Sequence, residues 1–419
     1  MSLPTPDLLK NMKPQPYHEG FVSPGDLERI LDKNIDSDTV QDLFTQGFEL
    51  AQQDELEHAI LVWDKVLDIE PDFVSAIYNQ GVAYLELEQI ENAQLKFERA
   101  LQLDFNYTQA RLNLGVALIA LKQYNRAIAN FEIILNKYPN LAQAWHNYGL
   151  ALFELNHLEA SIEKYNKALS IDSSRYLPHY CKGKALFFLD RLDEATQSYS
   201  TALKIQPDTP MALLSRGMVL ARAGKYEQAI NDFDKVIELD PSIVDSLVFH
   251  ERSVALAELR QFHEALESIT TFLQESPNLL PLAWYVKGIL LIHLDRKTEA
   301  AQNFNKFLDL LEPDSDEIWL YKPAIYGYKG QVDKAFECLY GLVETDPRLF
   351  IEVLDKGGFD NLKDDGRLDE LKLKAEARIK EILKEQGEIL AWIEHKRKTD
   401  PAMRGLPDPV QIIREARDR

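Results

Sequence analysis

Cysteine is scarce in this 419-residue sequence, which has only Cys181 and Cys338, far apart along the chain. We therefore expect no disulfide framework, and two free thiols fit a reducing compartment. No run of about 18 apolar residues occurs, which excludes an ordinary transmembrane helix. The first twenty residues also lack the apolar core of a signal peptide. We expect a cytoplasmic protein that does not enter a membrane.

Positive charge is also in short supply. Lysine and arginine number 47 against 68 aspartates and glutamates, which gives a formal net charge of −21. That balance argues against a general nucleic-acid surface and would repel an anionic membrane. Only residues 396–419 reverse it, with basic residues in excess. We expect the acidic side chains on solvated outer helix faces.

Catalytic motifs are missing as well. The sequence has no glycine-rich phosphate loop, and its histidines are scattered rather than clustered. His250 in "HERSVAL" lacks the second histidine of a zinc-protease helix. Neither cysteine has a recognisable histidine partner. The sequence therefore predicts a protein that is not an enzyme and that uses no cofactor and no metal.

A repeat of 34 residues dominates what is present. The run "YNQGVAYLELEQIENAQLKFERAL" begins at Tyr78, and "LNLGVALIALKQYNRAIANFEIIL" follows at Leu112 in the same register. Such a period is typical of repeat architectures. Glycine recurs with that spacing at Gly47, Gly81, Gly115, Gly149, Gly183 and Gly217. A small residue recurs at Ala59, Ala93, Ala127, Ser161, Ala195 and Ala229, and a bulky residue follows four later at Trp63, Phe97, Phe131, Tyr165, Tyr199 and Phe233.

Each repeated position has a physical reason. Glycine lets two helices approach closely, and the small residue faces it from the second helix. The aromatic residue fills the gap to the next unit, and a closing proline such as Pro139 ends the helix. The pattern resembles the tetratricopeptide repeat over residues 40–349, although Ser253 and Pro323 replace the glycine in the later units.

The resemblance implies an all-α fold, a right-handed superhelical α-solenoid of helix-turn-helix repeats with a helical C-terminal cap. A solenoid of this kind grows by stacking each unit on its neighbours. Because proline disrupts helices, we expect Pro323 to kink or interrupt the first helix of the last unit. The expected units are 40–73, 74–107, 108–141, 142–175, 176–209, 210–243, 246–279, 281–314 and 316–349.

Both ends differ from the repeats. Residues 1–22 carry four prolines and are expected to be extended or disordered, and residues 23–39 to form an N-terminal capping helix. Residues 350–398 are expected to form C-terminal capping helices, with Phe359 and Leu362 packed on the last repeat. Residues 399–419 form a basic tail that is either a frayed terminus, a docking motif or a strap across the protein's own groove.

In the resembled family, the first helix of each unit lines a concave groove that binds segments of partner proteins. The fifth and ninth positions of these helices are mostly aromatic or aliphatic, which suits an apolar partner. Asparagines at the sixth position could hold a peptide backbone, or could simply follow the family consensus. Inner residues could equally close against the interior. The candidate groove residues are Tyr78, Asn79, Asn113, His146, Asn147, Tyr180, Lys184 and Tyr285.

The sequence thus favours a non-enzymatic scaffold or adaptor that binds peptide or helical segments of proteins in this groove. The alternative is a regulatory module whose C-terminal helix and basic tail bind a target protein or nucleic acid under control of the solenoid. The terminal helices could also pair two copies of the chain. The carboxylate clamp of some family members is absent, because Phe44, Tyr78 and Leu112 occupy the place of its first lysine.

Overall fold

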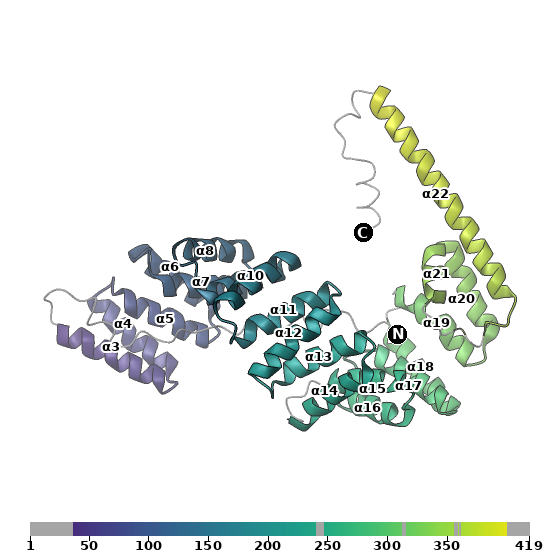
Figure 1. Cartoon of the computed structure of the whole chain (residues 1–419), viewed down its shortest axis with the longest axis horizontal. Helices are drawn as coiled ribbons and strands as arrows, with labels where there is room; N and C mark the ends of the chain where they lie inside the picture. The colour runs from purple at the N-terminus through teal and green to yellow at the C-terminus, as the bar shows by residue number, and fades with distance from the viewer. Residues whose placement is uncertain (1–36, 240–246, 312–315, 356–358, 360–361, 400–419) are drawn as a thin grey trace. The chain divides into compact units, whose positions relative to one another are not determined.

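The computed structural model describes the chain apart from residues 1–36, 240–246, 312–315, 356–358, 360–361 and 400–419. All regular structure in the described residues is helical (Figure 1). The chain divides into two compact units at Val244–Asp245. The expected extended segment 1–22, most of the expected capping helix 23–39 and nearly all of the basic tail lie outside the described residues.

The N-terminal unit contains alternating first and second helices of similar length. Each first helix packs on its own second helix, and each second helix packs on the next first helix. This consecutive pairing is the arrangement expected of a helical repeat array. The helices are α3 (Ser37–Gln52), α4 (Leu56–Ile69), α5 (Val74–Glu86), α6 (Ile90–Leu103), α7 (Thr108–Ala120), α8 (Tyr124–Lys137), α9 (Ala142–Glu154), α10 (Leu158–Ile171), α11 (Tyr176–Phe188), α12 (Leu192–Ile205), α13 (Pro210–Arg222) and α14 (Tyr226–Leu239).

The C-terminal unit continues the alternation and then adds two helices of a different kind. Helix α22 is much longer than the others, with 33 residues. The helices are α15 (Leu247–Glu258), α16 (Phe262–Glu275), α17 (Leu282–His293), α18 (Lys297–Leu310), α19 (Asp316–Tyr328), α20 (Val332–Thr345), α21 (Pro347–Asp355) and α22 (Arg367–Thr399).

The repeated glycine packs against the aromatic ring of its own unit. A Cβ built on Gly81 would lie 2.6 Å from Phe97 Cε1, and one on Gly288 would lie 2.4 Å from Phe304 Cε1. The expectation that the aromatic residue fills the gap to the next unit was therefore incomplete. Its ring lies inside the helix pair, where only glycine leaves enough room for it.

Two of the repeats lack the glycine, and both also lack the aromatic residue that stands sixteen positions later in the other repeats. Ser253 is followed by Ile269, and Pro323 by Leu339. An aliphatic side chain occupies less width than a ring, which leaves space for the added atoms. Helix α19 continues through Pro323 as one helix, so the expected interruption does not occur.

The turn between the two helices of each unit contains a residue in the left-handed region, at the fifteenth position of the expected unit. Glycine occupies it at Gly224 and Gly330, with φ of +73° and +72°. Side chains other than glycine pay a steric cost in this conformation. Residues other than glycine nevertheless adopt the left-handed conformation in the other repeats, with φ between 56° and 65°. They are Asp54, Glu88, Lys122, Asn156, Asp190, Arg260 and Asp295.

The last repeat is closed by the segment that follows it. Phe359 and Leu362 are buried in one apolar cluster with residues of α20 and α22, as predicted. Leu371 and Ala375 of α22 join that cluster and are fully buried. The first turns of α22 therefore cover the end of the array, as a solenoid with an open end requires.

Candidate interaction surface on the first helices

The candidate site is the inner face, which we define as the fifth, sixth and ninth unit positions of the first helices. In the N-terminal unit, the fifth-position side chains are all buried. Tyr78 is fully buried, with its ring centroid 5.8 Å from that of Phe97 and 5.0 Å from that of Tyr107. Asn79 beside it is also fully buried. These side chains thus contribute to packing as well as to the inner face.

Hydrogen bonds join the inner-face positions of successive units. Asn113 Nδ2 donates to the Tyr78 hydroxyl at 3.1 Å. Tyr180 and Ser215 repeat the relationship three repeats further on, with their hydroxyl oxygens 3.3 Å apart. In both cases a tyrosine at the fifth position meets a polar side chain at the sixth position of the next unit. Asn113 therefore has a structural partner inside the protein.

Helix α9 carries three buried polar side chains whose nitrogens have no hydrogen-bond partner among the described residues. These are Gln143 Nε2, His146 Nδ1 and Asn147 Nδ2. Burial, reinforced by the positive charge of Arg175, lowers the pKa of the His146 imidazole to about 4. His146 is consequently neutral near pH 7. A neutral imidazole and two amides form a polar, uncharged strip, in which each amide offers two N–H donors and the imidazole offers one donor and one acceptor nitrogen.

Helix α11 places a cation beside this strip. Lys184 is 5% exposed, and its Nζ lies 4.7 Å from the centre of the Phe153 ring. Burial lowers the pKa of Lys184, and the nearby Cys181 and Glu154 oppose that shift. Burial also raises the pKa of Glu154 and raises that of Cys181 to about 11. The Cys181 thiol is therefore protonated and weakly nucleophilic at neutral pH.

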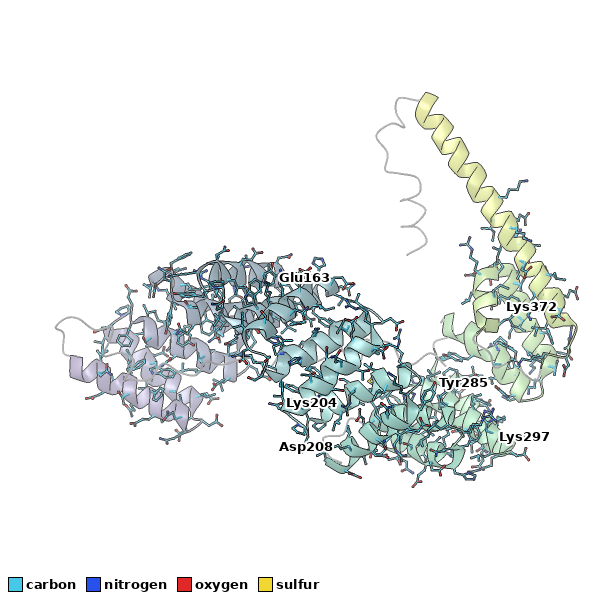
Figure 2. All side chains as sticks on the ribbon, viewed as in Figure 1. Glu163, Lys204, Asp208, Tyr285, Lys297 and Lys372 are labelled. Atoms are coloured by element: carbon cyan, nitrogen blue, oxygen red, sulfur yellow. The ribbon has the colours of Figure 1, made fainter. Side chains whose placement is uncertain are left out.

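Tyr285 lies in the C-terminal unit, on α17 (Figure 2). It is half-buried in an aromatic cluster, with its ring centroid 4.8 Å from Tyr321, 5.6 Å from Phe307 and 5.7 Å from Phe304. Burial raises the pKa of its hydroxyl well above the ordinary value. The other candidate residues all belong to the N-terminal unit.

A hollow of about 770 Å³ opens where the turns before α7 and α9 lie next to each other. Tyr107, Leu112 and Tyr138 line it with apolar surface, and Lys137 and Asn106 lie at the same place. Lys137 Nζ donates to Asn106 Oδ1 at 3.0 Å, which links the two turns. The hollow reaches Leu112, the fifth-position residue of α7, and so adjoins the inner face.

Sequence reasoning missed several of these neighbours. Gln143 stands at the second position of its repeat and Phe153 at the twelfth, outside the fifth, sixth and ninth positions that define the inner face. Both lie on the same side of α9 as His146, because they stand three residues before it and seven after it and a helix has 3.6 residues per turn. That periodicity was available in the sequence. The influence of Arg175, which precedes the next helix, depends on folding and left no sequence signal.

Two kinds of feature are absent from the described part of the chain. No cluster of three or more histidine, cysteine, aspartate or glutamate side chains is placed to bind a metal ion there. Within the same residues, no helix combines the length and the apolar character needed to cross a membrane.

Several solved structures resemble this chain at low sequence identity, between 16% and 23% for the three described next. No curated protein matches it. MamA from Desulfovibrio magneticus RS-1 shares 22% identity over 41% of this chain and 96% of its own, with a TM-score of 0.39. YrrB, described as a TPR protein with an unusual peptide-binding site, shares 23% over 41% and 88%, with a TM-score of 0.36. The pilF protein of Pseudomonas aeruginosa shares 16% over 49% and 92%, with a TM-score of 0.44.

Family models give a more direct result. Models described as tetratricopeptide repeats or TPR repeats match residues 74–107, 109–141, 149–190, 179–209, 210–243 and 251–315. These matches together cover more than half of the chain. Repeats of this family form scaffolds that generally mediate protein–protein interactions. The chain belongs to the tetratricopeptide repeat family.

Proposed function

We propose that the protein is a non-enzymatic scaffold that binds an extended segment of a partner protein along the inner face of its N-terminal unit. The observation that carries this proposal is the polar strip on α9, formed by Gln143, His146 and Asn147. Their buried nitrogens lack partners in the described structure. A buried donor without a partner costs about 1–3 kcal/mol, which a peptide carbonyl would recover.

The surroundings suit a peptide backbone with apolar side chains. Asn147 offers two amide donors and one acceptor, which can pair with a backbone whatever its sequence. The hollow beside Leu112 has room for one large apolar side chain of the same segment. Lys184 adds a positive charge at the next unit. The preferred segment is therefore extended, apolar at one position and acidic near its end at α11.

The test compares three full-length proteins as bait in the extract of the native source. These are the wild type, the double variant Gln143→Ala with Asn147→Ala, and Glu163→Ala, whose side chain is exposed on α10 (Figure 2). We expect a set of proteins whose recovery falls at least about tenfold with the double variant, as expected for loss of roughly 1.4 kcal/mol of binding free energy. The Glu163 variant should recover them normally. Equal recovery by all three would refute inner-face binding.

A second function is favoured by the length of α22. Buried positions in its described side chains end at Ala375, whereas the helix runs to Thr399. The described side chains from Glu376 to Lys384 are not buried, and this stretch would meet the target in the regulatory module described above. A chain ending at Lys398 tests this alternative, because loss of partner recovery from that chain would assign docking to the tail. Pairing of two copies through the terminal helices and a cytoplasmic location stay predictions.

A further inference from the structure

The hollow between the turns before α7 and α9 lies where the chain departs from its own repeat. The thirtieth position of the first six repeats is isoleucine or leucine, except at Lys137. The thirty-first is acidic or glutamine, except at Tyr138. Phe105 takes the thirty-second position, which is proline at Pro71, Pro139 and Pro207. All three departures fall on the two turns that form the hollow.

These three residues are not what makes the turns fold. The turns that begin at Glu70 and Asp172 have the same length and the same backbone pattern with the usual residues in place. Phe105 and Tyr138 are nevertheless 64% and 42% exposed, which is unfavourable for large apolar side chains in water. Aromatic residues are enriched where proteins bind other proteins. The position of these side chains therefore points to a ligand rather than to the fold.

The hollow combines aromatic walls with a cation. Tyr107, Leu112 and Tyr138 provide apolar surface, and the volume of about 770 Å³ is in the range typical of ligand pockets. Lys137 Nζ lies 5.4 Å from the centre of the Tyr138 ring and donates to Asn106 Oδ1 at 3.0 Å. That bond uses one of the three donors of the ammonium group. Among the described residues no carboxylate pairs with Lys137, so it can pair with one from a ligand.

The local charge also favours an acidic ligand. Asp104 is the one carboxylate among the described residues that line the hollow, and its Oδ1 accepts from the backbone N–H of Asn106 at 2.9 Å. Arg111 donates to the Phe105 carbonyl oxygen at 2.8 Å, with its guanidinium 4.3 Å from the centre of the Phe105 ring. Arg111 and Lys137 thus outnumber Asp104 at these turns, although the whole chain carries a net charge of −21. Such a local reversal of charge selects a complementary partner.

We propose that the hollow is a specificity pocket for an aromatic side chain of the bound partner segment, with an aspartate or glutamate close to that aromatic residue. The aromatic ring would pack against Tyr107 and Tyr138 in the tilted or offset geometry that aromatic pairs prefer. The carboxylate would pair with Lys137. An extended chain advances about 3.3 Å per residue, so a separation of about one to three residues spans the distance from the Tyr138 ring to Lys137 Nζ. The inference rests on the function proposed above, because it assigns chemistry to the segment bound there.

The first experiment selects peptides from a random-sequence display library with the immobilised full chain. We expect the enriched peptides to share an aromatic residue with an acidic neighbour. An enriched set without this pattern would overturn the proposal. One enriched peptide, synthesised with a fluorescent label, then serves as the probe for titrations.

The titrations compare the wild type with two full-length variants. Lys137→Ile combined with Tyr138→Asp installs the residues found at Ile171 and Asp172, so this turn should still fold and the melting curve should be unchanged. The dissociation constant of the peptide should rise by about tenfold or more, as for loss of a central contact. The matched control Gln206→Asp changes an exposed residue at the same position of another repeat and should bind normally. Equal affinity for all three proteins would refute the pocket.

Reversal of one charge tests the role given to the acidic residue. Lys137→Glu leaves the aromatic walls in place but removes the cation. It should weaken the selected peptide by about tenfold or more and should prefer a version in which lysine replaces the acidic residue. If Lys137→Glu kept the preference of the wild type, Lys137 would not recognise that position and the proposal would fail.

A last titration separates the hollow from the inner face. The same peptide is titrated against the full chain that carries Gln143→Ala with Asn147→Ala. Loss of affinity only in the Lys137 and Tyr138 variant would support the hollow and reject inner-face binding. Loss only in the Gln143 and Asn147 variant would reject the hollow and leave the function proposed above intact.

Discussion

Gly115 and Phe131 are packed so closely that a Cβ on Gly115 would lie 2.4 Å from Phe131 Cε1. The ring is fully buried and has little freedom to move aside. We expect Gly115→Ala to lower the free energy of unfolding by about 1–3 kcal/mol, the usual cost of overpacking. Urea denaturation followed by circular dichroism measures this. Gly366→Ala is the control, because no atom lies within 4 Å of the added Cβ, and it should change stability little.

The units that lack this glycine suggest how the clash is relieved. Combining Gly115→Ser with Phe131→Ile recreates the pair found at Ser253 and Ile269. The double variant should therefore be more stable than the sum of the two single changes predicts, by about 1 kcal/mol or more. Simple additivity would show that the glycine and the ring do not share one space.

Removal of the Tyr78 hydroxyl should destabilise the protein. Tyr78→Phe leaves the buried Asn113 amide without the acceptor that it now uses at 3.1 Å. The expected loss is about 1–2 kcal/mol in the free energy of unfolding. Tyr148→Phe is a matched control, because that hydroxyl donates to Glu132 in an exposed position and should matter much less. Equal losses in the two variants would assign no special role to the link between units.

The stability of the N-terminal unit should fall in mild acid because of His146. Its pKa is about 4 in the folded chain, against an ordinary value of 6.5. The unfolded chain therefore binds this proton first, and the folded state loses stability as the pH falls from about 6.5 to 4. The full effect is roughly 3 kcal/mol. His146→Gln should have a flatter dependence of melting temperature on pH over this range, and parallel curves would exclude the effect.

Asp232 should be far more important for stability than the exposed acidic residues. Arg216 donates to both of its carboxylate oxygens, at 2.7 and 2.8 Å, and the Asp232 side chain is only 9% exposed. Asp232→Ala would leave the guanidinium half-buried without its partner, at a cost of about 2–4 kcal/mol. Asp193 pairs with Lys225 at 2.9 Å in solvent, and its replacement by alanine should cost well under 1 kcal/mol. Urea denaturation of both variants would reveal whether burial sets the difference.

The left-handed turn residues should respond to glycine in opposite directions. Lys122→Gly removes a side chain from a residue with φ of 58° and should stabilise the protein by about 0.5–1 kcal/mol. Gly224→Ala, at the same unit position with φ of +73°, should destabilise it by a similar amount. Thermal unfolding of the two variants measures both changes. If both shifted the melting temperature in the same direction, conformational strain would not be the cause.

Much of the fold followed from the period of 34. The spacing of glycine, small and aromatic residues predicted helix pairs, and the structure has them in that order. The pattern did not show whether each aromatic ring packs within its own helix pair or against the next repeat, because spacing along the chain does not give the direction of a side chain. It also allowed Pro323 to interrupt its helix, whereas α19 runs through the proline as one helix.

The candidate site was harder to predict. The repeat register assigns Asn113, His146 and Lys184 to the first helices of successive repeats, and α7, α9 and α11 are neighbours in the structure. The register could not show that Asn113 is already bonded to Tyr78, because that contact spans two units. Nor could it show that His146 is neutral, since its pKa depends on how deeply the folded chain buries it. Binding by these residues stays a prediction.

The left-handed turns have a consequence for how this sequence can change. Asp54, Glu88, Asp190 and Asp295 all occupy that conformation. Every aspartate or glutamate codon becomes a glycine codon by a change of its middle base. A stabilising substitution is therefore within reach of a single point mutation at four separate repeats, none of which needs to alter the inner face. Selection that enforces only a threshold of stability does not require such changes, so they would offset destabilising substitutions elsewhere in the chain.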